Sequence, residues 1–122
     1  MQQGEQSKIL SRDRLEEIRD AGGEELLEEV LFEYRSDLDR LPTAMAAAWR
    51  AGDGGELRRL AHGLKGASAN LGAEALAAHC AAIERSAQAG GPYLEILVTD
   101  LTPQVEALLP HLAFYLDPSG SR

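Results

Sequence analysis

A histidine and a lysine lie one helical turn apart in AHGLKGASANLG, residues 61–72, a stretch rich in small residues. His62 offers a nucleophilic ring nitrogen, and Lys65 follows it at a spacing that makes the two side chains neighbours on a helix. Gly63 and Gly66 stand in the same stretch, although each glycine inside a helix costs about 1 kcal/mol relative to alanine. We therefore expect that something other than helix stability favours these glycines.

The apolar residues around this stretch predict which side of its helix faces the core. At about 100° per residue, six residues point within roughly 50° of one direction. They are Leu57, Leu60, Ala61, Leu64, Ser68 and Leu71. His62 lies about 140° from that direction, so we expect its ring to be exposed. Its neighbours on the outer surface are three cations and two residues with almost no side chain: Arg58, Arg59, Lys65, Gly66 and Ala69.

An exposed histidine among cations suits the acceptance of a phosphoryl group. Nearby positive charge favours the neutral, nucleophilic ring and attracts a phosphoryl dianion. Lys65 is placed to balance the added charge, and Gly66 and Ala69 leave a shallow surface that a partner's backbone can approach. No catalytic base, metal cluster or nucleotide-binding loop accompanies the site in the sequence, so we expect the partner to supply the chemistry.

The whole chain has the composition of one globular domain, with 122 residues, 44% of them hydrophobic and 26% charged. Its net charge of −8 argues against binding to nucleic acid or to anionic membranes. The charge is unevenly distributed, because residues 24–39 hold seven acids and one arginine, whereas residues 57–73 hold three bases and no acid. The histidine therefore lies in a locally positive part of an acidic chain.

A single cysteine, Cys80, is typical of a protein from a reducing compartment. The N-terminus lacks the pattern of a signal peptide, and no apolar run approaches the roughly 18 to 20 residues that span a bilayer. We expect a cytoplasmic monomer, and Met1 favours a free-standing protein over a piece of a longer chain.

Helical patterns occupy nearly the whole sequence. Ser11 is a candidate N-cap for a short first helix that ends before Gly22-Gly23. A longer second helix carries an apolar stripe with alternating spacings of four and three. The stripe consists of Leu27, Leu31, Tyr34, Leu38, Leu41, Met45 and Ala48. Pro42 predicts a kink or a break in this helix, because proline cannot donate to the Leu38 carbonyl, and residues 52–55 end it.

Three further segments complete the pattern. A third helix is predicted from about 56 to 71, stopped by Gly72, and a fourth from about 73 to 89, stopped by residues 90–92. The last segment carries an apolar stripe from Leu94 to Leu116. In it, Pro103 either opens a new helix with Thr102 as the cap or kinks a long one, and the sequence leaves both open.

No segment shows the alternation of a half-buried strand, and β-branched residues are few. We therefore predict an all-α fold, an antiparallel up-and-down four-helix bundle with an additional short N-terminal helix. It is expected to be a single domain over residues 1–122, with loose ends at 1–10 and 117–122.

The central motif resembles the signature of the histidine-containing phosphotransfer (HPt) domains of two-component phosphorelays. That signature is His-x-Leu-Lys-Gly, two small residues, two variable ones, an aliphatic residue and a glycine. It corresponds here to His62, Leu64, Lys65, Gly66, Ala67, Ser68, Leu71 and Gly72. The resemblance is close over residues 24–89, and four later residues fit the family's usual continuation: Leu76, Cys80, Ile83 and Glu84. Gly63 departs from the family, many of whose members carry a larger residue there, as does Ala67, where serine is frequent.

The resemblance implies that His62 is phosphorylated at its distal ring nitrogen. The phosphoryl group would come from the aspartate of a receiver domain, or from a sensor (hybrid) histidine kinase, and would pass to a response-regulator aspartate. Lys65 would stabilise charge and Gly66 would give access. Helix geometry adds three residues that face the partner: Arg58, Arg59 and Ala69. The chain would need no cofactor or metal of its own, because the receiver brings Mg²⁺, and it would be a phosphocarrier without autonomous catalysis.

Two other classes of function compete with this interpretation. One is a docking module that binds and inhibits a receiver or a kinase without carrying phosphate. The other is a helical-bundle metalloprotein, which needs Glu-x-x-His pairs on facing helices. No such pair surrounds His62 or His111, and His79 follows Glu74 at the wrong spacing. His79 and Cys80 are adjacent, but no second pair completes a zinc site.

Overall fold

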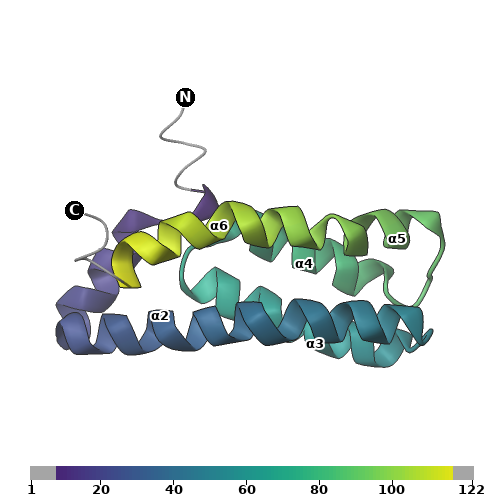
Figure 1. The fold of residues 1–122 in the computed structure, drawn as a ribbon, viewed down its shortest axis with the longest axis horizontal. Coiled ribbons are helices and arrows are strands. Elements are labelled where there is room, and N and C mark those ends of the chain that lie inside the picture. The colour runs from purple at the N-terminus through teal and green to yellow at the C-terminus, as the bar shows by residue number, and fades with distance from the viewer. Residues whose placement is uncertain (1–7, 117–122) are drawn as a thin grey trace.

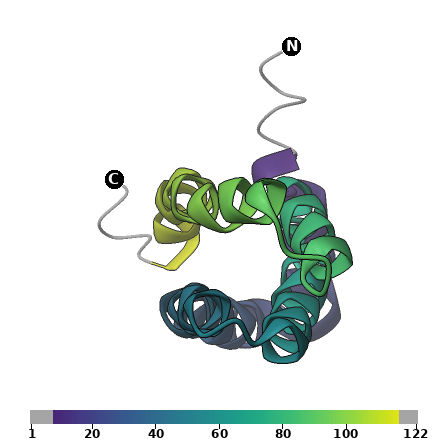
Figure 2. The same ribbon diagram turned by 90° about the vertical axis from the view of Figure 1, so that its right-hand side faces the viewer.

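A computed structural model describes residues 8–116, all of whose regular elements are helices. The helices are α2 (Arg12–Arg50), α3 (Gly54–Asn70), α4 (Glu74–Ser86), α5 (Pro92–Thr99) and α6 (Leu101–Leu116). Figure 1 shows them running mostly lengthwise and side by side, with the purple first part of α2 lying across one end and with α5 and α6 following one another along the same side of the molecule. Seen end on, α2, α3, α4 and the α5–α6 pair enclose the core (Figure 2). The predicted all-α bundle is confirmed, with the fourth position filled by two consecutive helices.

The predicted short N-terminal helix is present as the first part of α2. Ser11 caps it as expected, because its hydroxyl accepts a hydrogen bond from the Arg14 backbone N–H at 3.1 Å. The helical dihedrals stop at Gly23, which has φ 83° and ψ −179°. Glycine adopts this left-handed φ without the steric cost that a side chain brings. The chain therefore changes direction at Gly23, close to the predicted boundary.

Pro42 does not break α2. Gly23 is the only residue inside α2 with non-helical dihedrals, so the helix continues through the proline. The apolar stripe on either side explains the difference, because Leu38, Leu41 and Met45 are all buried. Packing of this continuous stripe outweighs the one backbone hydrogen bond that proline removes.

The break between α5 and α6 lies at Asp100 rather than at Pro103. Asp100 closes α5 by donating its backbone N–H to the Ile96 carbonyl at 2.9 Å. Pro103 occupies the first turn of α6, where a backbone N–H needs no partner within the helix. Of the two alternatives, a new helix is correct, but Thr102 lies within it and is not its cap.

The N-terminal segment is fixed against the far end of α3. Leu10 is buried, so the predicted loose end of residues 1–10 is wrong at this position, while residues 1–7 and 117–122 lie outside the described part of the chain. The Ser11 N–H donates to the Gly72 carbonyl at 3.1 Å, and Arg14 Nε donates to the Asn70 carbonyl at 2.8 Å. Gly72 has φ 75°, and a Cβ there would lie 2.4 Å from Ser11 Cβ. This junction therefore requires glycine.

Two polar groups lie within the core. The hydroxyls of Tyr34 on α2 and Ser68 on α3 form a hydrogen bond at 2.7 Å, and Ser68 is fully buried. Burial raises the pKa of the Tyr34 phenol above its ordinary value of 10.0. Burial also raises the pKa of the Cys80 thiol to about 12, so Cys80 stays protonated and acts as a small apolar side chain.

None of the described helices is both long and apolar enough to cross a membrane.

Candidate functional site

The local sequence of α3 explains how His62 is presented. Asp53 caps the helix through a hydrogen bond from the Glu56 N–H to Asp53 Oδ1 at 3.0 Å, so α3 starts at Gly54, slightly before the predicted residue 56. The six residues predicted to face the core are all buried: Leu57, Leu60, Ala61, Leu64, Ser68 and Leu71. His62 lies on the opposite side with 68% of its side chain exposed. Both predictions, the core face and the exposed histidine, are confirmed.

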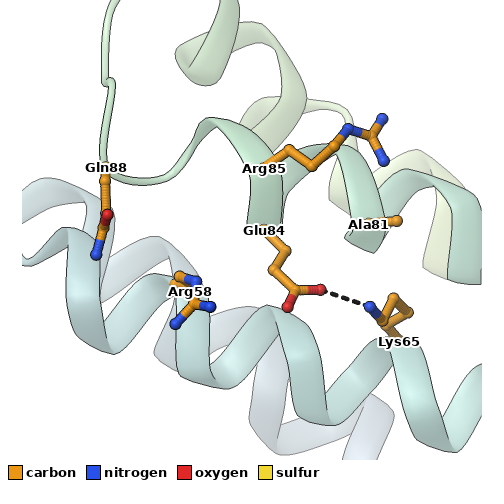
Figure 3. Close-up of a pocket in the computed structure, with 6 residues that line it drawn as sticks. All are labelled: Arg58, Lys65, Ala81, Glu84, Arg85 and Gln88. Atoms are coloured by element: carbon orange, nitrogen blue, oxygen red, sulfur yellow. Dashed lines mark ion pairs between the residues drawn. The ribbon is translucent and has the colours of Figure 1, made fainter.

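Glu84 on α4 joins His62 to Lys65. Its Oε2 lies 2.9 Å from His62 Nδ1, and its Oε1 lies 2.7 Å from Lys65 Nζ (Figure 3 draws the latter pair). The carboxylate is largely covered, with 17% of the side chain exposed. The family resemblance includes Glu84 only in the usual continuation of the motif, and no sequence pattern assigns it a role, because residues 22 positions apart in different helices share no local pattern. The prediction that only positive charges surround His62 is therefore wrong, because the carboxylate of Glu84 lies against its ring.

The charge of Glu84 determines which ring nitrogen is free. Two hydrogen bonds hold the pKa of Glu84 below its ordinary value of 4.5. The one from Lys65 Nζ has the larger effect, and the one from the His62 ring has the smaller. An ionised carboxylate only accepts hydrogen bonds, so His62 Nδ1 must carry the proton that it donates to Glu84. In the neutral ring, Nε2 then bears the lone pair. The contact thus leaves the distal nitrogen as the nucleophilic atom.

The two arginines beside His62 differ in their surroundings. Arg59 donates two hydrogen bonds to Glu56, at 2.7 and 2.8 Å, so its charge is offset within α3. Arg58 forms no ion pair within the part of the chain that the structure describes. It lies one turn before His62 and faces α4.

The two glycines of the motif helix have open space around them. A Cβ built at Gly63 or at Gly66 meets no heavy atom within 4 Å. Contacts of the folded chain therefore do not require glycine at either position, which contrasts with Gly72. Ala69, one turn beyond Lys65, is exposed as predicted. Gly66 and Ala69 therefore present only small, exposed groups on this side of His62.

A hollow of about 470 Å³ lies next to the histidine, between α3 and α4. Six residues line it: Arg58, Lys65, Ala81, Glu84, Arg85 and Gln88. In Figure 3, Arg58 and Gln88 lie on one side of Glu84, and the Arg85 side chain extends along α4 towards Ala81 on the other. Lys65 and Glu84 belong both to this hollow and to the site at His62.

The other two histidines lie apart from the site. His79 Nε2 is 2.7 Å from the Leu97 carbonyl, which ties α4 to α5. His111 lines a separate hollow with Arg12 and residues of α6. Between residues 8 and 116, no group of three or more His, Cys, Asp or Glu side chains is placed to hold a metal ion.

Comparison with known proteins gives one family. Residues 10–113 match the family model of the Hpt domain. Searches of curated proteins and of solved structures found no match. The matched range contains all of α2, α3, α4 and α5 and most of α6, so it covers the site and the bundle around it.

Proposed function

Since the chain belongs to the Hpt domain family, whose members carry phosphoryl groups on histidine in phosphorelays, we propose that His62 is its phosphoacceptor. The observation that carries this proposal is the pairing of an exposed ring with a covered carboxylate. Glu84 holds the proximal nitrogen Nδ1 and leaves Nε2 facing solvent with its lone pair. A histidine that accepts a phosphoryl group needs a ring held in one orientation and an attacking nitrogen that the donor can reach.

This geometry supports the following transfer step. The Nε2 lone pair attacks the phosphorus of a receiver's aspartyl phosphate, and the N–P bond forms as the P–O bond to the aspartate breaks. The electron pair of that bond leaves with the aspartate carboxylate. The Nδ1 proton stays in the hydrogen bond to Glu84, whose negative charge stabilises the positive charge that develops on the ring. The reverse of this step delivers the phosphoryl group to the aspartate of the next receiver.

Lys65 is the cation that would balance the added phosphoryl charge, because its Nζ already lies beside the ring's carboxylate partner. Gly66 would let the receiver's backbone come close, and three further residues would form the docking rim: Arg58, Arg59 and Ala69. The receiver supplies Mg²⁺ and its own active site in this scheme, so the chain acts as a carrier without a cofactor or autonomous catalysis. We propose that it works as a cytoplasmic monomer between a sensor kinase and response regulators.

Phosphoryl transfer from a phosphorylated receiver domain, in the presence of Mg²⁺, tests this function. The wild type is compared with His62→Gln and with the matched control His111→Gln, whose histidine lies outside the site. We expect an acid-labile, alkali-stable label on the wild type and the control and none on His62→Gln. If the wild type takes no label while receivers bind it and His62→Gln equally well, the carrier is ruled out in favour of the docking inhibitor.

A further inference from the structure

The hollow beside the phosphoacceptor presents two arginines that form no ion pair with any residue that the structure describes. Neither Arg58 nor Arg85 forms an ion pair among residues 8–116, whereas Lys65 in the same hollow is paired with Glu84. Both arginines are exposed and lie on either side of Glu84 (Figure 3). Two guanidinium groups therefore remain available to a partner at the edge of the site.

Helices α3 and α4 come into direct contact near these arginines. A Cβ at Gly54 would lie 2.8 Å from the Ala87 carbonyl oxygen, so the first turn of α3 and the end of α4 are in direct contact there. Arg58 follows this contact by one turn, and His62 follows Arg58 by one more, at about 5.4 Å per turn. A partner group that enters the hollow would thus lie about one helical turn from the transferred phosphoryl group.

The charge of the hollow differs in sign from that of the chain. Its lining holds three bases and one acid, whereas the whole chain has a net charge of −8. Guanidinium groups bind carboxylates with paired, charge-assisted hydrogen bonds. A nucleic acid would be repelled by the acidic remainder of the protein, whereas a single carboxylate on a partner meets only the local field.

We propose that Arg58 and Arg85 bind acidic side chains that a receiver domain presents beside its phosphorylated aspartate. These contacts would select among receivers, because a receiver with neutral or basic residues at those points would leave two cations unpaired in the interface. The inference rests on the proposed function for the identity of the partner. Its test uses binding, which does not depend on phosphoryl transfer.

Binding is measured with isolated receiver domains whose aspartate carries beryllofluoride and Mg²⁺, a stable mimic of the phosphorylated state. The receiver that binds the wild type most tightly is then titrated against Arg58→Glu and Arg85→Glu. Arg12→Glu is the matched control, since it makes the same change of charge at an exposed arginine that lines a different hollow. Melting temperatures of all variants verify that the fold is intact.

We expect each reversal in the hollow to weaken binding at least tenfold at low salt and to flatten its dependence on ionic strength. Arg12→Glu should change the dissociation constant less than twofold. A reversal on the receiver, with one exposed acidic residue near its phosphorylated aspartate changed to arginine, should restore binding to Arg58→Glu or Arg85→Glu.

Three results would overturn the proposal: unchanged binding by both variants, an equal loss with Arg12→Glu, or no restoration by any acidic residue of the receiver. Normal labelling of His62 together with any of these would refute the arginine contact alone. If Arg58→Glu and Arg85→Glu weaken binding but His62 of the wild type takes no label, the phosphocarrier function is refuted and the docking surface is supported.

Discussion

Glu84 Oε2 lies 2.9 Å from His62 Nδ1, so a carboxylate from α4 orients the ring that α3 exposes. Replacing Glu84 by alanine removes this hydrogen bond and frees the ring to rotate. We expect phosphoryl transfer to His62 to slow roughly tenfold, the scale of one charge-assisted hydrogen bond. Glu84→Gln should fall between the wild type and Glu84→Ala, because its amide oxygen accepts from Nδ1 but carries no charge to stabilise the ring. Stopped-flow or rapid-quench transfer measures both.

A matched control for this prediction is Glu95→Ala, an exposed carboxylate on α5. It should transfer at the wild-type rate. Equal rates for the wild type and Glu84→Ala would contradict the orienting role.

The same carboxylate predicts a pH dependence of stability. The pKa of Glu84 is lowered in the folded state, chiefly by the hydrogen bond from Lys65. The ionised Glu84 side chain therefore stabilises the fold fully above its unfolded-state pKa, ordinarily about 4.5. This stabilisation disappears as the pH falls through the folded-state pKa. We expect the wild type to be more stable than Glu84→Gln at pH 6 and the two to converge in acid. Urea unfolding from pH 3 to 7 tests this, and a constant difference across that range would contradict it.

Gly66→Ala should make the protein more stable and a poorer phosphoacceptor. A Cβ at position 66 meets nothing within 4 Å, so alanine should add up to about 1 kcal/mol of stability through its higher helix propensity. The same methyl group would stand in the path of the receiver backbone beside His62. We expect a higher melting temperature together with slower transfer.

Gly63→Ala is the control for Gly66→Ala, because its Cβ also meets nothing within 4 Å. It should raise the melting temperature by a similar amount and leave the transfer rate near that of the wild type. If both alanine variants transfer like the wild type, Gly66 does not serve access.

Gly72→Ala should destabilise the protein strongly. The new Cβ would lie 2.4 Å from Ser11 Cβ, and φ 75° is itself unfavourable for alanine. Strain and overlap together should cost about 2 kcal/mol or more, visible as a lower midpoint in urea.

Gly52→Ala separates these two causes. Gly52 has a similar φ of 71°, but a Cβ there meets no atom within 4 Å. It should therefore cost only the backbone strain, about 1 kcal/mol. If Gly72→Ala and Gly52→Ala lose equal amounts of stability, the overlap with Ser11 contributes nothing to the effect at Gly72.

Much of this architecture could be predicted from the sequence because helical periodicity reports burial directly. The apolar stripe of α3 determined its core face, and the exposure of His62 followed from its angle to that stripe. The break at Gly23 was predicted within one or two residues, because a left-handed φ favours glycine.

The errors share a physical origin, which is that tertiary contacts override local signals. A break at Pro42, one of the two outcomes predicted there, does not occur, because packing on both sides keeps α2 continuous. Leu10 has no local pattern to show that it packs into the core beside the Gly72 junction. Glu84 was not assigned to the site because the register between α3 and α4, which places it against His62, is set by the packed core and not by either segment alone.

The burial of Cys80 makes this protein convenient for spectroscopy. Its thiol is the chain's only one, is fully covered and stays protonated at neutral pH, so maleimide reagents should not reach it in the folded state. A cysteine introduced on the exposed surface, for example by Glu95→Cys, would then be the single reactive position. A fluorophore attached there could follow receiver docking in real time without any prior removal of the native cysteine.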